Sequence, residues 1–173
     1  NHVGPSPNPI TGRRTAMDFR CKVALFGHMG VEANPADMSA DERDLLRQLI
    51  ALYQQWRDRM HRGDHWQLHH DDSGVFAQMI VDGDHGLAVV AQTRFAEAFD
   101  AVPLRLKGLD ADADYNVHLP KPWPQKAEAY LANPVVWQEG LILSGRYLME
   151  QGLAIPLTHP ETAWVIVLER IER

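Results

Sequence analysis

Two runs of the sequence hold side chains that could bind a metal ion. The first run, HWQLHHDD, contains His65, His69, His70, Asp71 and Asp72. On an extended strand His65 and His69 share one face, but His70 points to the opposite face because side chains alternate. No second group of ligands accompanies them, so a zinc site is disfavoured and we interpret the run as a solvated edge strand.

The second run has the spacing that opens a calcium-binding loop. Its carboxylates are Asp110, Asp112 and Asp114. Tyr115 stands where such a loop requires glycine, and Lys121 stands where it requires a bidentate glutamate. We therefore predict no metal site in the chain, and no residue pattern indicates a cofactor.

Three tryptophans offer a different chemistry, the stacking of an aromatic ring on the apolar face of a sugar. They are Trp123, Trp137 and Trp164. Large aromatic side chains more often fill a core or an interface. We favour core packing and keep a sugar-binding platform as the alternative.

Composition narrows the classes of function. The chain has 173 residues, 45 % of them hydrophobic, and a net charge of −6, which indicates a folded globular protein without a basic surface for nucleic acid. No apolar run approaches the roughly 20 residues that span a bilayer, so no membrane partner is expected. The one cysteine, Cys21, forms no internal disulfide and suits a buried thiol in a cytoplasmic protein.

The first third of the chain has helical spacing around one short strand. Thr15 and Asp18 form a capping-box pattern that predicts a helix over residues 16–26. Residues 28–33 predict a short strand. Ser39 and Glu42 form a second capping box, followed by an apolar stripe that Gly63 closes.

After Gly63 the hydrophobic period changes from that of helices to that of strands. Residues 65–95 contain three apolar runs separated by the turn sequences DDSG and DGDHG, which predicts a meander. Further strands are predicted at VPLRLKGL, YNVHLP, GLILSGRYLM and TAWVIVLERI. The fold class is mainly β with N-terminal helices, and residues 63–173 are expected to form an antiparallel sandwich or barrel.

The short strand over residues 28–33 needs a parallel neighbour, because an isolated strand leaves its backbone groups unpaired. We expect residues 1–62 to be the end of a larger α/β domain whose earlier strands precede Asn1. The alternative is that both helices only cover the β domain and that the short strand is a loop.

The N-terminal motifs resemble glycoside hydrolase family 36, the bacterial α-galactosidases. The residues that carry the resemblance are His2, Pro7-Asn8, Thr11-Gly12-Arg13, Phe19-Arg20, Val23-Ala24 and Phe26-Gly27. Pro9 departs from the family, in which many members have histidine. The resemblance continues more weakly to LILSGRYLMEQGLAIP and so covers essentially the whole chain.

The resemblance implies a fold and a division into domains. Residues 1–62 would be the last strand–helix units of a truncated catalytic (β/α)8 barrel, and residues 63–173 the C-terminal β domain. His2 would lie where barrel enzymes bind substrate, at the carboxyl end of a strand, although a histidine bonded within its own loop is the simpler interpretation. Arg13, Asp18 and Arg20 would support the end of the barrel.

The resemblance also implies an activity, the retaining hydrolysis of terminal α-galactosides such as melibiose or raffinose. The family's catalytic carboxylates lie in Lys-Trp-Asp and Ser-Asp motifs, and neither motif occurs in this sequence. We therefore expect no catalytic residue in this chain and no activity from it alone. The parent enzyme would be a homo-oligomer. A carbohydrate-binding module and an oligomerisation module remain as alternatives.

Overall fold

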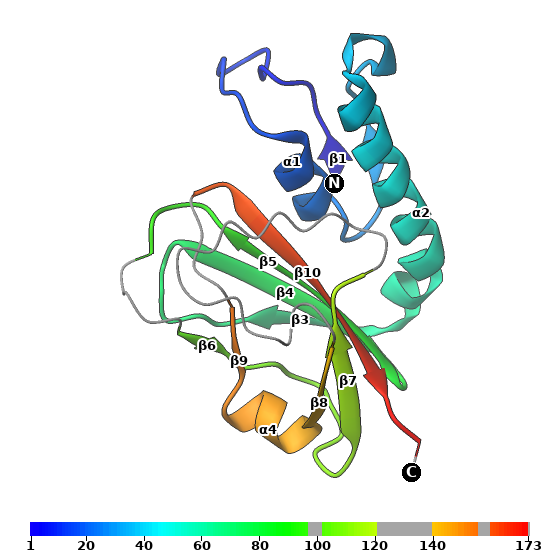
Figure 1. Ribbon diagram of the computed structural model, residues 1–173, viewed down its shortest axis with the longest axis vertical. Helices are drawn as coiled ribbons and strands as arrows, with labels where there is room; N and C mark the ends of the chain where they lie inside the picture. Colours follow the sequence, from blue (N-terminus) through cyan, green and yellow to red (C-terminus); the bar gives the residue numbers. More distant parts are fainter. Residues whose placement is uncertain (97–101, 121–139, 156–159, 173) are drawn as a thin grey trace.

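A computed structural model describes residues 1–96, 102–120, 140–155 and 160–172 of the chain. Its largest feature is an antiparallel sheet of six strands, with two helices over one face (Figure 1). Shorter elements, β6, β9 and α4, lie on the opposite side of the sheet in the same view. This arrangement confirms a mainly β fold with N-terminal helices.

The chain begins with a parallel pair of strands joined through a helix. Strand β1 is His2–Val3, helix α1 is Met17–Val23 and strand β2 is Gly30–Val31. His2 pairs with Gly30 and Val3 with Val31, in parallel register. The predicted short strand is therefore real and has its parallel neighbour within this chain, so its interpretation as a loop is wrong.

The predicted cap of α1 is also wrong. The N-cap is Ala16, and no side chain caps this end of the helix. Thr15 instead belongs to the preceding loop, where its backbone N–H donates to Ser6 Oγ at 3.1 Å. Its carbonyl accepts from Arg20 Nε at 3.0 Å. Contacts with the loop thus replaced the local capping box, and the regular helix ends at Val23, earlier than predicted.

The second helix follows the sequence prediction closely. After a 3-10 turn at Pro35–Asp37, α2 runs over Ala40–Arg62. Ser39 Oγ accepts from Glu42 N at 3.2 Å, and Glu42 Oε2 accepts from Ser39 N at 3.0 Å. The buried stripe consists of Leu46, Leu49, Leu52, Trp56 and Met60. No helix in the described part of the chain is long and apolar enough to cross a bilayer.

The main sheet has the strand order β3-β4-β5-β10-β7-β8. Its strands are β3 Asp64–Leu68, β4 Val75–Asp82, β5 His85–Gln92, β7 Asp114–His118, β8 Leu141–Ser144 and β10 Thr162–Arg170. The meander β3-β4-β5 is confirmed, and β3 is an edge strand as expected. The last strand, β10, lies between β5 and β7, which makes it central.

A smaller layer covers the other face of the sheet. It consists of the two-stranded sheet β6 Pro103–Leu104 with β9 Leu153–Ala154, and of α4 Gly145–Glu150. The run GLILSGRYLM was expected to be one strand, but its second half is this helix. Ser144 is the reason, since its Oγ accepts from Tyr147 N at 3.2 Å and caps the helix.

Each face of the sheet has its own apolar core. On the helix side, the residues of α1 and α2 form one cluster with sheet residues Ile80, Leu87, Val89, Val165 and Val167. On the other side, β10 contributes Trp164, Ile166 and Leu168 to a second cluster. Residues 1–62 and the β strands therefore share one core. Both helices cover the sheet, as the alternative hypothesis required, while α1 also joins a parallel strand pair.

Candidate functional site

The parallel pairing of β1 with β2 places His2 beside a carboxylate. His2 lies on β1, and its Nε2 is 3.2 Å from Oε2 of Glu32, which directly follows β2. The side chains remain open to solvent, at 57 % exposure for His2 and 62 % for Glu32. Sequence reasoning found His2 but missed Glu32, although its position at the end of a predicted strand was a usable signal.

The chain from Gly4 to Thr15 forms a loop that leaves the same end of β1. Together with His2 and α1 it encloses a hollow of about 460 Å³. The polar part of its lining includes Asn8, Thr11, Arg13 and Arg20, and the apolar part includes Phe19. The hollow therefore presents hydrogen-bonding groups beside an aromatic ring at the edge where barrel enzymes build their sites.

Asn8 organises the tip of the loop. Its side-chain oxygen accepts from Ile10 N at 3.0 Å and from Thr11 N at 2.9 Å. The backbone carbonyl of Asn8 accepts from Gly12 N at 2.8 Å, and Gly12 has a φ of 68°, which glycine adopts without strain. A short polar side chain that bonds the following backbone N–H groups fixes a turn locally.

Arg20 joins the two ends of the loop. From α1 its guanidinium donates to Gly4 O at 2.5 Å and to Thr15 O at 3.0 Å. A third, longer contact reaches Glu42 Oε1 at 3.4 Å. The Arg20 side chain is only 12 % exposed, so these charge-assisted bonds satisfy a cation that is largely removed from water.

Arg13 connects the loop to the β domain. Its Nε donates to Glu161 Oε1 at 2.8 Å, and its Nη2 approaches the same oxygen. Glu161 directly precedes β10. Asp18 forms an ion pair within α1, with Lys22 at 2.7 Å.

Two potential nucleophiles on α1 are buried, and burial changes the pKa of each. Burial lowers the pKa of Lys22, whose side chain is 2 % exposed, while Asp18 opposes the shift. Burial raises the pKa of Cys21 to about 12. Since the thiolate is the nucleophile, Cys21 is inert at neutral pH, and it is the free, buried thiol that the sequence predicted.

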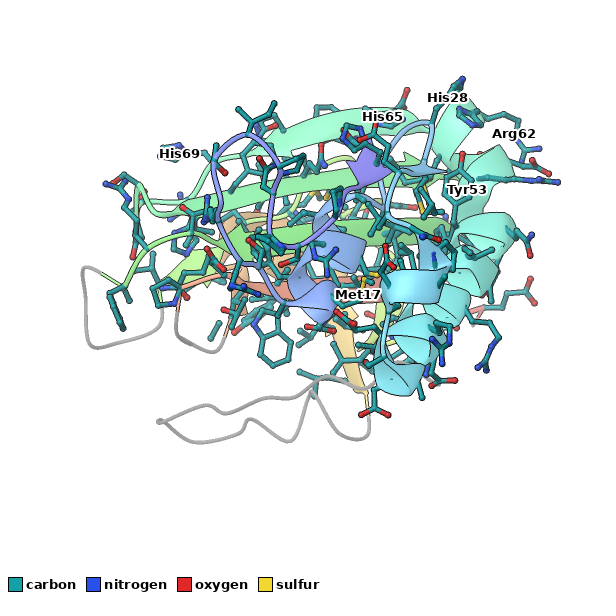
Figure 2. The ribbon with its side chains drawn as sticks, turned by 90° about the horizontal axis from the view of Figure 1, so that it is seen from above. Met17, His28, Tyr53, Arg62, His65 and His69 are labelled. Carbon is teal, nitrogen blue, oxygen red and sulfur yellow. The ribbon has the colours of Figure 1, made fainter. Side chains whose placement is uncertain are left out.

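The histidine-rich run does not form a cluster. His65 Nε2 lies 2.6 Å from Met60 O and His70 Nε2 lies 3.0 Å from Val102 O, so each ring contacts backbone. His69 lies at the opposite end of β3 from His65, as Figure 2 shows, and its Nε2 is 3.4 Å from Asp71 Oδ1. Among the described residues, no three His, Cys, Asp or Glu side chains are grouped as metal ligands.

Two carboxylates of the acidic run form ion pairs with arginines. Asp110 Oδ2 lies 3.0 Å from Arg170 Nη2, and Asp112 Oδ1 accepts from Arg146 Nη2 at 2.8 Å. Each of these carboxylates therefore has a protein cation as its partner. These ion pairs link the turn before β7 to α4 and to the end of β10.

The tryptophans divide into one that is buried and two that lie outside the described residues. Trp164 is 5 % exposed and belongs to the second core, so core packing is confirmed for it. Trp123 and Trp137 fall in the range that the structure does not describe. A sugar-stacking platform that includes Trp164 is therefore ruled out by its burial.

Two family models match the chain, one after the other. The model named Melibiase matches residues 1–63, and the model of the glycosyl hydrolase family 36 C-terminal domain matches residues 75–168. The second match covers more than half of the chain.

Among curated proteins, the chain is 32 % identical to an α-galactosidase of Escherichia coli over 98 % of its own length. It is 31 % identical to the bifunctional α-galactosidase/sucrose kinase AgaSK of Mediterraneibacter gnavus over 90 % of its length. The chain spans 25 % of the first of these proteins and 15 % of the second.

Solved structures of α-galactosidases have a fold similar to that of this chain. The galactosidase domain of AgaSK has a TM-score of 0.80 and 29 % sequence identity over 98 % of this chain, which corresponds to 22 % of that structure. An α-galactosidase from Geobacillus stearothermophilus, solved with raffinose, also has a TM-score of 0.80. It is 22 % identical over 98 % of this chain and 21 % of its own, and therefore supports the fold alone.

Proposed function

Because this chain belongs to glycosyl hydrolase family 36, we propose that it is part of an α-galactosidase that hydrolyses terminal α-galactosides with retention of configuration. The observation that carries the proposal is the parallel β1-α1-β2 unit, followed by α2 and an antiparallel domain. A parallel pair connected through a helix is the repeating unit of a (β/α)8 barrel, in which the active site lies at the carboxyl ends of the strands.

The proposal assigns residues 1–62 to the end of the barrel and residues 63–173 to the C-terminal domain. The matches of the two family models, over residues 1–63 and 75–168, support this division. The shared core then means that the C-terminal domain supports the barrel end by packing against α1 and α2.

His2 is the proposed substrate-facing residue of this chain. It is exposed on β1, beside the loop that leaves this strand, and its Nε2 lies 3.2 Å from Glu32 Oε2, which orients the ring. Arg20, Arg13 and Asp18 are proposed as support, since the two arginines hold the loop and Asp18 forms an ion pair within α1. A retaining glycosidase needs two carboxyl groups about 5 Å apart. We propose that both carboxyl groups belong to the part of the catalytic barrel that this chain does not span.

Hydrolysis of para-nitrophenyl α-galactoside tests the activity. The protein that contains this chain together with a complete barrel should release nitrophenol, and the 173-residue chain alone should release none. Nuclear magnetic resonance of the first product should show the α-anomer of galactose. Activity of the isolated chain, or a β-anomeric product, would contradict the proposal.

Substitution of His2 tests the site. In the complete enzyme His2→Ala should raise KM about tenfold, the factor expected for one lost hydrogen bond of about 1.4 kcal/mol. His69→Ala is the matched control, because His69 is also an exposed histidine beside a carboxylate, at 3.4 Å from Asp71. Equal KM values for the two variants would remove His2 from the site.

We also propose that the enzyme is a homo-oligomer and that it is cytoplasmic. The first proposal is supported by exposed apolar side chains near one edge of the described sheet, Leu141 and Ile142 on β8 and Tyr147 on α4. Edge strands of this kind pair readily with another copy. Ile142→Lys should lower the mass measured by sedimentation.

The reduced, buried Cys21 supports the proposal that the enzyme is cytoplasmic, and fractionation of the native cells would test it.

The alternative of a carbohydrate-binding module makes a separate prediction, that the isolated chain binds galactosides. Isothermal titration with melibiose should give no heat of binding if the enzyme proposal is right. Measurable binding by the chain alone would favour the module.

A further inference from the structure

Loop 4–15 is held at three points, and one of them lies in the β domain. Its ends are joined by Arg20, and its tip is built by Asn8, both within residues 1–62. The remaining anchor is the ion pair between Arg13 and Glu161, two residues that are 148 positions apart in the sequence. This pair is therefore the long-range tether of the loop.

The backbone at Glu161 has a conformation that residues with a side chain disfavour. Glu161 has a φ of 63°, and it is the only residue other than glycine with positive φ in the described part of the chain. This left-handed region disfavours a side chain and is usually occupied by glycine or asparagine. A glutamate held in such a conformation points to a role beyond local folding.

Glu161 is fixed to the main sheet by a backbone hydrogen bond. The backbone N–H of Glu161 donates to Gln92 O at 2.8 Å, at the end of β5, and β10 begins at the next residue. The Glu161 side chain is only 27 % exposed, and both Arg13 contacts converge on one of its carboxylate oxygens. The carboxylate thus projects from two central strands toward the loop.

We infer that Glu161 is a positioning residue for the glycosidase reaction, which acts through Arg13 to hold loop 4–15 against the substrate. This inference rests on the proposed function, since the loop leaves the carboxyl end of β1 beside His2. It gives the C-terminal domain a part in catalysis in addition to its packing against α1 and α2, because one of its residues holds a loop beside His2.

The test uses the complete enzyme with Glu161→Gln, which keeps the size of the side chain and removes its charge. Asp82→Asn is the matched control, because Arg62 and Asp82 also join α2 to the sheet, at 3.0 Å, with exposures of 67 % and 25 %. The Arg13 and Glu161 side chains have exposures of 60 % and 27 %. Both variants lose one ion pair of the same kind, but only the first loses a contact to the loop.

Glu161→Gln should lower kcat/KM for para-nitrophenyl α-galactoside about three- to tenfold, in the range of a partly exposed charge-assisted bond. Asp82→Asn should leave it unchanged, with a melting temperature similar to that of Glu161→Gln. Arg13→Gln should have the same effect as Glu161→Gln, and the double variant should be no worse than either, because both substitutions remove one interaction.

Hydrogen exchange gives a readout that does not depend on activity. The amides of Ile10, Thr11 and Gly12 are bonded within the loop and should exchange faster in Glu161→Gln than in Asp82→Asn. An active wild type with unchanged kcat/KM and exchange in Glu161→Gln would overturn this inference and leave the proposed function intact. A wild type that does not hydrolyse α-galactosides would overturn both.

Discussion

The apolar core between the helices and the sheet makes a prediction about cooperativity. Leu49 on α2 is completely buried and belongs to the cluster that includes Ile80, Leu87 and Val165 of the sheet. Helix α2 contacts β4, and α1 contacts β5 and β10. Because one core serves both segments, residues 1–62 and the β domain should unfold together.

The perturbation is Leu49→Ala. It removes three carbon atoms, worth about 0.8 kcal/mol each on transfer from water, or about 2.4 kcal/mol. The cavity left in a close-packed site raises the loss in the free energy of unfolding to about 3–4 kcal/mol. With a urea m-value of about 2 kcal/mol/M, the unfolding midpoint should fall by about 1.5–2 M.

The assay is urea unfolding of the 173-residue chain, followed by far-ultraviolet circular dichroism and by tryptophan fluorescence. Both signals should shift together, with an unchanged m-value. Ile10→Ala is the control, because it also removes three carbons, but from a residue that is 91 % exposed, and should change stability by less than about 0.5 kcal/mol. Two separate transitions, or a shift confined to one signal, would refute the shared core.

Three further predictions concern single positions. Ser39→Ala should lower the free energy of unfolding by about 1 kcal/mol, because it removes the hydroxyl oxygen that accepts from Glu42 N and caps α2; urea unfolding should detect the change. Gly145→Ala should lower the free energy of unfolding by about 2–3 kcal/mol, because a Cβ there would lie 2.0 Å from Asp110 O; an unchanged urea midpoint would contradict this close packing. At pH near 8, iodoacetamide should label Cys21 about a thousandfold more slowly in the native chain than in urea, since a pKa raised from 9.0 to about 12 lowers the thiolate fraction by about that factor. Equal labelling rates would show that the thiol is not buried.

Features whose causes are local could be predicted from the sequence. Helix α2 begins at Ser39 and ends before Gly63 because its capping box, apolar stripe and stop signal lie within one segment. The turn between β4 and β5 is likewise local, since Gly83 has a φ of 59° and is one of the residues in the predicted turn. The motifs around Thr11-Gly12-Arg13 carried the family resemblance, and the family was confirmed.

Features decided by distant partners could not be predicted. Thr15 has the sequence of a helix cap but bonds to Ser6 and Arg20, because the loop supplies better-placed partners than the helix does. The run around Ser144 reads as one strand, yet the serine ends the strand and starts a helix. Glu32 becomes part of the candidate site only because β2 pairs in parallel with β1.

By itself, the sequence determined helix α2, the meander β3-β4-β5 and the family, since hydrophobic period, caps and turn residues act over a few positions. Only the tertiary structure decided that β10 lies between β5 and β7, that helices and sheet share one core, and that Glu161 meets Arg13. The physical reason is that strand order and ion pairs between distant segments depend on chain closure over many residues, and no local pattern records that closure.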